Sequence, residues 1–339
     1  MSAWSRRRFL LIAAGGAAAA GGASSFLAGG GQTWPAVTRT TKALGTRVAL
    51  TVRDRRADEA ELAIADAFEE LALVERLMSI YRPDSQLSRL NATGELFDPH
   101  PHLLAVLSHA QRTSQQSGGA FDVTVQPLWE VFAAAQKQQR LPSAAEVAAA
   151  RSRVDWRQIE IAERRVRLLR PGTKITLNGI AQGFAADRVR SVLEEHGIQH
   201  ALIDAGELNS IGHSPRASAW RVGIQHPRDP EAYIALADLD GRALATSGDY
   251  ATRFSPDGYY NHILDPRSGY SPTEVASVSV LAPSATAADA LSTTLFVLGE
   301  QRGLRLLAAQ RHTDMFMVLK SGETIATPGF PLRAAGRAG

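Results

Sequence analysis

TLNGIAQGFAAD, residues 176–187, is the stretch of this sequence that decides how the chain folds. Its periodicity changes at Asn178–Gly179, a pair of residues typical of tight turns. The run Lys174–Leu177 reads as a β-strand, whereas apolar residues recur at helical spacing from Ile180 to His196. The sequence therefore predicts a strand, a turn and a helix in succession. The inner face of that helix is expected to carry Ala181, Ala185, Val189 and Val192.

Outward from this stretch, helices and strands alternate irregularly along the chain. Helical spacing predicts a helix from Asp58 to the proline turn at Tyr81–Ser85, with an apolar stripe of Ile64, Phe68, Leu71 and Met78. Further helices are predicted over His102–Ser117, within 130–153 and over about Thr286–Leu298. Strands are predicted at Thr46–Val52, Phe121–Val125, Gln158–Ala162, Arg165–Leu169, Ala201–Asp204, Trp220–Gln225, Tyr233–Leu239 and Val275–Leu281, after a lead-in over 31–45. This order favours an α+β fold with largely antiparallel sheets and packed helices.

Five segments are polar where packing alone would not require it. They are YRPDSQLSRLN (81–91), GAFDVTVQP (119–127), TLNGIAQGFAAD (176–187), ATSGDY (245–250) with NHILDPRSG (261–269), and AADALST (287–293). In this order they resemble the ApbE family of FAD:protein FMN transferases, and the resemblance extends from about Leu44 to Gly299. It implies an ApbE-like, T-fold-like architecture.

Asp289 and Thr293 are four residues apart, so on a helix their carboxylate and hydroxyl share one face. Two such oxygen atoms suit Mg²⁺, which keeps waters or phosphate oxygens as its other ligands. The residues alone also allow Asp289 to complement the positive end of its own helix while Thr293 packs inside. The resemblance implies a metal site of Asp289, Thr293 and the backbone carbonyl of Gly179.

The Asn178–Gly179 turn resembles a phosphate cradle, because glycine lets the backbone approach an anion and the next helix offers free N–H groups. An ordinary turn is the alternative from the residues alone. The resemblance implies that this segment contacts the FAD diphosphate and flavin. Thr176 stands where most members carry Asp, and Gln182 where most carry Lys. Loss of a cation beside a diphosphate is expected to weaken FAD binding or slow transfer.

The resemblance also implies that an FAD pocket is lined by Leu44, Tyr81, Ala120, Phe121, Asp122 and Leu264, together with Thr176 and Gln182. Tyr81 is expected to stack on a ring and Asp122 to accept from adenine or ribose. A helix-end aromatic and a strand-edge acid are the alternatives. Leu44 replaces the usual Met, an apolar exchange that preserves packing.

His262 lies in a segment whose Asp-Pro and Ser-Gly pairs favour a sharp turn. A histidine near neutrality is able to accept a proton from an attacking hydroxyl. Most lone histidines have no such role, so the alternative of a turn residue stays open. Within the resemblance, His262 and Asp289 are the candidate catalytic residues.

The expected activity is Mg²⁺-dependent transfer of FMN from FAD to a threonine hydroxyl of a target protein, with release of AMP. The resemblance implies exported acceptor proteins, subunits of respiratory or electron-transfer complexes, that carry a threonine-containing motif. Two alternatives are a Mg²⁺-dependent FAD pyrophosphatase and a non-catalytic periplasmic FAD-binding protein.

The N-terminus has the pattern of an export signal. Arg6, Arg7 and Arg8 precede a short apolar stretch that ends in small residues, which is typical of a twin-arginine signal over 1–30 and predicts a periplasmic protein. A tether to the inner membrane through an uncleaved signal is the alternative. Removing these arginines lowers the basic count from 37 to 34, against 34 acidic residues, so no nucleic-acid partner is expected. No cysteine is present, which excludes thiolate metal sites and lipid attachment through cysteine. Residues 31–339 are expected to form one flavin transferase domain.

Overall fold

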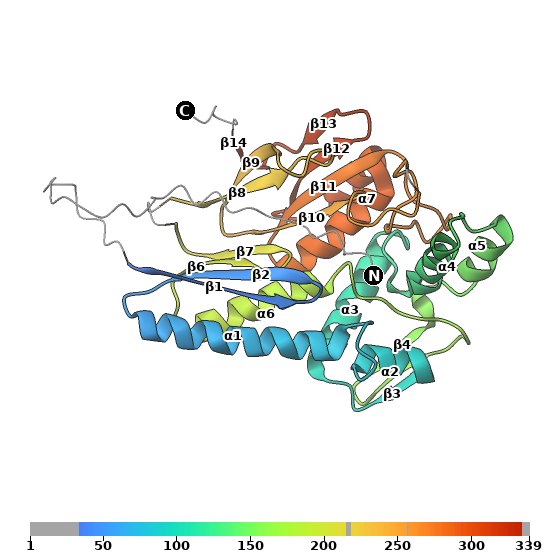
Figure 1. The fold of residues 1–339 in the computed structure, drawn as a ribbon, viewed down its shortest axis with the longest axis horizontal. Coiled ribbons are helices and arrows are strands. Elements are labelled where there is room, and N and C mark those ends of the chain that lie inside the picture. The colour runs from blue at the N-terminus through green and yellow to red at the C-terminus, as the bar shows by residue number, and fades with distance from the viewer. Residues whose placement is uncertain (1–33, 215–217, 256, 334–339) are drawn as a thin grey trace, which may run out of the picture.

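A computed structural model describes residues 34–214, 218–255 and 257–333, so the proposed signal over 1–30 lies outside the described residues. An eight-stranded sheet forms the centre of the molecule, and each pair of neighbouring strands in it is antiparallel (Figure 1). Its strands, in spatial order, are β1 (Ala36–Ala43), β2 (Thr46–Arg53), β6 (His200–Asp204), β7 (Leu208–Ile211), β10 (Ala243–Gly248), β11 (Val275–Ala282), β12 (Asp314–Leu319) and β13 (Thr324–Ala326). The α+β fold with largely antiparallel sheets is therefore confirmed.

Three long helices form a layer on one face of this sheet. They are α1 (Ala57–Met78), α6 (Ala181–Glu195) and α7 (Ala285–Leu307). Helix α1 packs on β1 and α6, α6 packs on α7, and α7 packs on β10 and β11. The predicted inner face of α6 is confirmed for Ala181, Ala185 and Val189, which are buried, while Val192 is half-buried against the same core.

A small sheet of β14 (Leu332–Arg333), β9 (Tyr233–Leu239) and β8 (Trp220–Gln225) covers the opposite face of the large sheet. Trp220 and Val222 of the small sheet share a core with Leu244 and Phe316 of the large one. The molecule thus has three layers, with the large sheet between the helices and the small sheet.

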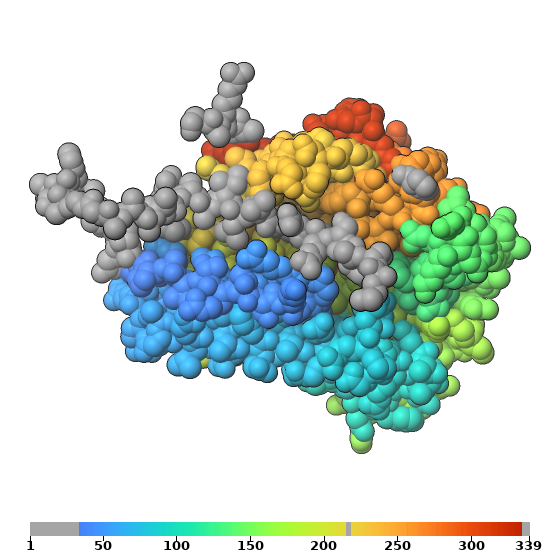
Figure 2. Space-filling model, in the orientation of Figure 1, coloured from blue at the N-terminus to red at the C-terminus, as the bar shows by residue number. Residues whose placement is uncertain are grey.

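The segment between α1 and α6 forms a further lobe at the end of α1 (Figure 1). It contains a sheet ordered β3 (Glu95–Phe97), β5 (Arg165–Leu168), β4 (Ile159–Ala162), and the helices α2 (Gln86–Thr93), α3 (Pro101–Gln116), α4 (Gln126–Lys137) and α5 (Ala144–Arg151). In Figure 2 the green surface of α4 and α5 borders the orange surface of the C-terminal half. Leu128 and Phe132 of α4 pack there with Phe254 and Leu264.

The predicted strand over Phe121–Val125 is wrong, because Val123–Val125 forms a short 3₁₀ helix, η1. Asp122 caps this helix: one carboxylate oxygen accepts from the Thr124 backbone N–H at 2.8 Å and from the Thr124 hydroxyl at 2.6 Å. An aspartate that satisfies the first backbone donors favours a helical turn over a strand.

The predicted strand over Lys174–Leu177 is also wrong, because the backbone there forms neither a strand nor a helix. The Asn91 side chain takes the place of a neighbouring strand. Its amide nitrogen donates to the Ile175 carbonyl at 2.8 Å, and its oxygen accepts from the Ile175 N–H at 2.7 Å. The Thr176 N–H donates to the Val123 carbonyl at 2.8 Å. Side chains and a loop therefore satisfy the hydrogen bonds of this segment.

Two element boundaries also differ from the prediction. Much of the lead-in over 31–45 is strand β1, and the helical region 130–153 is split into α4 and α5, where Ser143 and Glu146 form a capping box. The predicted helix end at about Leu298 agrees with the structure, because the non-helical backbone of Gly299, with a φ of 72°, breaks α7 there, and a second helical part runs on to Leu307. No helix of the described residues has the length and apolarity needed to span a bilayer.

Candidate functional site

The Asn178–Gly179 turn brings the backbone before α6 against α7. A Cβ placed on Gly179 would lie 3.1 Å from Thr293 Oγ1 and 3.5 Å from the Phe121 ring. A side chain at 179 would therefore press into the Thr293 hydroxyl. The predicted backbone ligand and the predicted hydroxyl ligand are neighbours in the folded chain.

Asp289 and Thr293 lie one turn apart on α7, as the spacing predicts. Asp289 is only 3% exposed, and its Oδ2 accepts from the Gly183 N–H at 2.9 Å. Helix α7 begins at Ala285, with Ser284 as its own cap, so Asp289 lies beyond the first turn. The interpretation that Asp289 complements the positive end of its own helix is wrong, because its carboxylate accepts from the first turn of α6 instead.

Ser247, on β10, adds a hydroxyl that the sequence did not single out as part of the metal site. Its Oγ lies 3.1 Å from Thr293 Oγ1 and 2.8 Å from Ser292 Oγ. Ser247 lies 46 residues before Thr293 in the sequence, so no local spacing connects the two. Asp249, two residues further on, is buried, and its two carboxylate oxygens accept from Arg228 at 2.6 and 2.9 Å. This ion pair explains why a charged residue occupies that position.

A cavity of about 110 Å³ lies beside these oxygen atoms. Its lining includes most of the predicted site residues, namely Ala120, Phe121, Asp122, Thr176, Gly179, His262, Leu264, Asp289 and Thr293. The structure therefore brings the predicted metal, catalytic and much of the predicted FAD-binding set to one place.

Leu44, Tyr81 and Gln182 do not line that cavity but lie around the start of α6. Leu44 and Gly45 form the β1–β2 turn with φ values of 51° and 74°, and the Leu44 carbonyl accepts from Gln182 Nε2 at 3.4 Å. Tyr81 is 55% exposed and interacts with the side chain of Asn178. Tyr81 thus contacts the Asn178–Gly179 turn, whereas Leu44 and Gln182 contact each other at the start of α6.

Asp122 has a clear structural role in addition to lining the cavity. Its second oxygen accepts from the Trp156 backbone N–H at 3.0 Å, so both oxygens hold the local backbone. Burial raises the pKa of Asp122, and hydrogen bonds from Thr124 and Trp156 oppose that effect. A ligand atom at Asp122 would share a carboxylate that already has backbone donors.

His262 enters the cavity from the loop that follows β10. Its backbone N–H donates to the Thr252 carbonyl at 3.0 Å, which fixes the loop. Asp265 is paired with Arg267 through bonds of 2.8 Å to each oxygen, so it shapes the turn. Leu264 is 5% exposed and packs against α4. The histidine is thus presented by a rigid turn to the cavity that holds Asp289 and Thr293.

The charge of the cavity bears directly on what it can hold. Its described lining carries the carboxylates of Asp122 and Asp289 and neither Lys nor Arg. A diphosphate in such a cavity would meet carboxylates without a basic side chain to offset them, so a cation is needed beside it. The neutral Thr176 and Gln182 add no charge of either sign.

The donor set fits a hard divalent cation. Asp289, Thr293, Ser247 and the Gly179 backbone have oxygen atoms there, and the described residues contain no group of three or more His, Asp or Glu side chains that could hold a metal by themselves. One carboxylate with neutral oxygens suits Mg²⁺, which takes remaining ligands from water and phosphate.

Comparison with known proteins gives one consistent family. A sequence model of the ApbE family matches residues 44–317. The FAD:protein FMN transferase of Salmonella typhimurium is 32% identical over 264 residues, covering 74% of this chain and 75% of the relative. That of Treponema pallidum is 30% identical over 317 residues, covering 86% and 87%.

Solved structures agree with this. The flavin transferase ApbE from Vibrio cholerae superposes with a TM-score of 0.75 at 27% identity, covering 87% of this chain and 98% of its own. The ApbE protein of Thermotoga maritima superposes with a TM-score of 0.79 at 28% identity, covering 87% and 97%. The architecture and the order of elements are therefore similar along nearly the whole of both chains.

Proposed function

This chain belongs to the ApbE family and is an FAD:protein FMN transferase, and from that premise we propose that it uses Mg²⁺ to attach FMN to a threonine hydroxyl and releases AMP. The observation that carries the proposal is the cavity lined by Asp122 and Asp289 without Lys or Arg, beside a cluster of oxygen atoms from α7, β10 and the Gly179 turn. A dinucleotide whose diphosphate is compensated by a divalent ion matches both features.

Asp289, Thr293 and the Gly179 carbonyl would hold the ion. When bound, Mg²⁺ neutralises charge on the diphosphate of FAD and so favours attack at phosphorus. The N–H groups of Ile180 and Ala181 donate to the Leu177 carbonyl, and that of Gly183 donates to Asp289. The diphosphate would therefore be held mainly through the ion, with neither these N–H groups nor a basic side chain of the cavity wall to bind it.

His262 is the proposed base. It lines the same cavity as Asp289 and Thr293, on a turn fixed by backbone hydrogen bonds. In the proposed step the threonine oxygen forms a bond to the FMN phosphorus, the bond from that phosphorus to the oxygen bridging to AMP breaks, and His262 takes the hydroxyl proton. AMP leaves with the bridging oxygen.

The acceptors and the place of reaction are proposals of the same kind. Arg6, Arg7 and Arg8 before a short apolar stretch support export by the twin-arginine route, and an exported enzyme would meet exported electron-transfer subunits. Expression in a bacterium with and without an intact twin-arginine system, followed by fractionation, tests this. Equal amounts in the periplasm in both strains would contradict the route.

The activity is tested by mixing the purified protein with FAD, Mg²⁺ and an exported acceptor fragment that contains a candidate threonine. Mass spectrometry is expected to show one FMN added with loss of water, and liquid chromatography to show AMP in equal amount. The same acceptor with alanine for the threonine is the control. FMN and AMP without an adduct would indicate a pyrophosphatase, and tight FAD retention with no turnover would indicate a binding protein.

A further inference from the structure

Helices α6 and α7 each hold the first turn of the other through an aspartate. Asp289 of α7 accepts from the Gly183 N–H of α6 at 2.9 Å. Asp187 of α6 accepts from the Ala285 N–H at 2.8 Å and from the Thr286 N–H at 2.8 Å, both in the first turn of α7. First-turn amides of a helix have no partner within the helix, so each carboxylate satisfies donors that the other helix leaves open.

Asp187 is the more heavily used of the two aspartates. In addition to the two backbone amides, its Oδ2 accepts from the Thr286 hydroxyl at 2.6 Å, and its Oδ1 from Asn209 Nδ2 at 3.0 Å. Asn209 belongs to β7 and is itself bonded to Arg190. Asp187 therefore joins α6, α7 and the central sheet at one point.

The two helices touch through their backbones at this point. A Cβ on Gly183 would lie 2.2 Å from the Ala285 carbonyl oxygen and 2.7 Å from Asp289 Cβ. The separation of the helices is thus set by backbone contact and by the two aspartates. The proposed metal ligands stand on both sides of the contact, with Gly179 just before α6 and Asp289 and Thr293 on α7.

We infer that Asp187 is a positioning residue for the proposed metal and diphosphate site. By holding the first turn of α7 against α6, it fixes the place of Asp289 and Thr293 relative to the Gly179 carbonyl. Ligand distances at a metal tolerate deviations of about 0.2 Å, so a small shift between the helices weakens binding. This inference rests on the proposed function, because it concerns the same site.

The alternative is that Asp187 only stabilises the start of α7, and Ser284 offers a matched control for it. Ser284 Oγ accepts from the Ala287 N–H at 3.2 Å and is the cap of α7 from its own chain segment. Ser284→Ala removes a bond to the same helical turn without touching α6. Asp187→Asn replaces an acceptor oxygen with a donor facing other donors, which releases α7 from α6.

The experiment compares the two variants in the mature enzyme. Both are expected to lower the melting temperature. Only Asp187→Asn is expected to raise the Mg²⁺ concentration for half-maximal flavin transfer, by about tenfold or more, as supporting residues of metal sites typically do. Only this variant is expected to speed hydrogen exchange in a peptide spanning residues 180–187 in metal-free protein, because the Gly183 amide then loses a fixed partner.

An unchanged Mg²⁺ requirement in Asp187→Asn, or an equal rise in Ser284→Ala, would overturn the inference while leaving the proposed function in place. A wild-type enzyme that transfers FMN without a divalent ion would overturn both. If Asp187→Asn does not fold, Thr286→Val removes the hydroxyl bond alone. It is expected to raise the Mg²⁺ requirement about twofold, and an unchanged value would likewise overturn the inference.

Discussion

Asp289 is 3% exposed, and a buried carboxylate remains charged only where hydrogen bonds or a cation replace its lost water. The Gly183 amide, at 2.9 Å, supplies one hydrogen bond from α6. The hydroxyl of Thr293, one turn away, and that of Ser247 supply further oxygen atoms beside it rather than a basic side chain. At the scale of single residues, Asp289 therefore both joins two helices and, with Asp122, gives the cavity its negative charge.

Asp289→Asn removes the negative charge of this side chain while keeping an acceptor for the hydrogen bond that joins the two helices. The amide oxygen still accepts from Gly183, so the melting temperature is expected to fall by only a few degrees, whereas flavin transfer is expected to fall by about 10²-fold or more for loss of a charged ligand. Rates at saturating FAD across a Mg²⁺ series measure this. A rate within threefold of wild type would show that the carboxylate charge is not needed.

Gln182 stands at the start of α6, where its side chain donates to the Leu44 carbonyl. Gln182→Lys places a positive charge where a dinucleotide anion is proposed to bind, and a single such charge near the surface contributes about 1 kcal/mol. The KM for FAD is expected to fall several-fold. Gln182→Met, similar in length and uncharged, is the control and should leave KM within twofold. Equal KM values for both variants would argue that this residue is remote from the diphosphate.

Asp204, at the end of β6, is a buried acid near this region. Burial raises its pKa from 3.8 to about 6, against the effects of the Gly206 N–H and Arg47. A raised folded-state pKa means that the folded protein binds the proton more tightly, so stability falls as the pH rises from about 4 through 6. The free energy of unfolding falls by roughly 3 kcal/mol in total over this pH interval.

Asp204→Asn keeps an acceptor for the Gly206 N–H and removes the titration. The variant is expected to match wild type in free energy of unfolding near pH 4.5 and to exceed it by up to a few kcal/mol at pH 7.5. Urea unfolding at the two pH values measures the difference. A variant that is less stable than wild type at pH 7.5 would show that the charged carboxylate is compensated in the folded state.

At the scale of elements, the contact between α6 and α7 depends on glycine. Gly183→Ala would place a methyl group 2.2 Å from a backbone oxygen, which no rotamer change relieves. We expect a loss of about 1–3 kcal/mol in stability and a larger loss of flavin transfer than the melting temperature alone explains. Gly303→Ala is the control within α7, because its methyl would meet the movable end of Leu295 at 3.3 Å and the Leu295 carbonyl oxygen at an ordinary contact distance of 3.8 Å. It should leave stability unchanged or raised.

The long helices α1, α3, α6 and α7 could be predicted from the sequence, because their apolar spacing is local information, whereas the short helix α2 was missed. The stripe of α1 and the inner face of α6 both follow from it. The strands over Phe121–Val125 and Lys174–Leu177 could not be judged in the same way, since Asp122 and the distant Asn91 provide the partners of those backbones. Alternating polar and apolar side chains do not show which groups will pair with the backbone N–H and C=O groups.

The candidate site could likewise be predicted from the sequence only where its residues are close together along the chain. Asp289 and Thr293 share a helix face, which spacing alone predicts, but their approach to Gly179 comes from a contact between helices more than a hundred residues apart in sequence. Family resemblance supplied that pairing. Ser247 reaches the site only because β10 lies beside α7 in the fold, and no local pattern carries that information.

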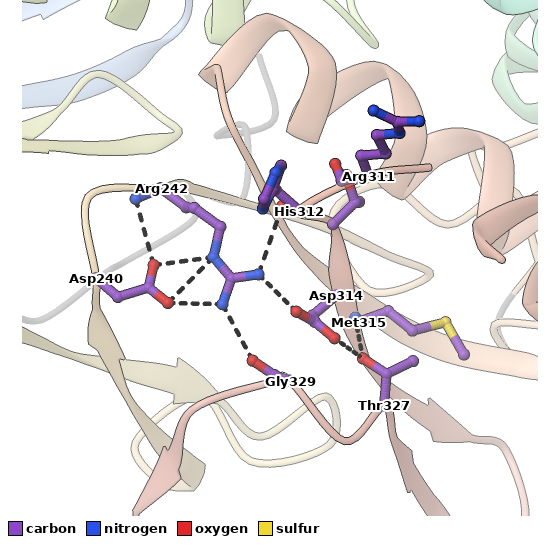
Figure 3. Close-up of polar contacts among 9 residues, drawn as sticks. Asp240, Arg242, Arg311, His312, Asp314, Met315, Thr327 and Gly329 are labelled. Atoms are coloured by element: carbon purple, nitrogen blue, oxygen red, sulfur yellow. Dashed lines mark hydrogen bonds and ion pairs between the residues drawn. The ribbon is translucent and has the colours of Figure 1, made fainter. Parts of the chain in front are cut away.

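At the scale of the whole molecule, the C-terminal half is held together near the β9–β10 turn by Arg242 (Figure 3). Its guanidinium donates to Asp240 at 2.7 Å, to Asp314 at 2.5 Å and to the Gly329 carbonyl at 3.0 Å. Asp314 opens β12 and also accepts from the Thr327 hydroxyl at 2.6 Å. One side chain therefore links the start of β10, the start of β12 and the segment that leads to β14.

Arg242→Met removes this link and leaves Asp314, whose side chain is 16% exposed, without its guanidinium partner. Removing one partner of a largely buried ion pair costs about 3–5 kcal/mol, because the remaining charge loses its compensation. Arg333→Met is the matched control. Arg333, near the C-terminus, also pairs with an aspartate, Asp238 of β9, at 2.7 Å, but the Arg333 side chain is 61% exposed, so its loss is expected to cost less than about 1 kcal/mol.

Urea unfolding distinguishes the two arginine variants, and flavin transfer at a temperature where both are folded gives the second measurement. Arg242 does not line the cavity of Asp289 and Thr293, so the rate should stay near wild type although the stability falls. Equal stabilities for the two variants would show that Arg242 is no more than a surface charge. A lost rate in a folded Arg242→Met enzyme would show that the start of β10 transmits its position to Ser247, five residues further along the strand, and so to the site itself.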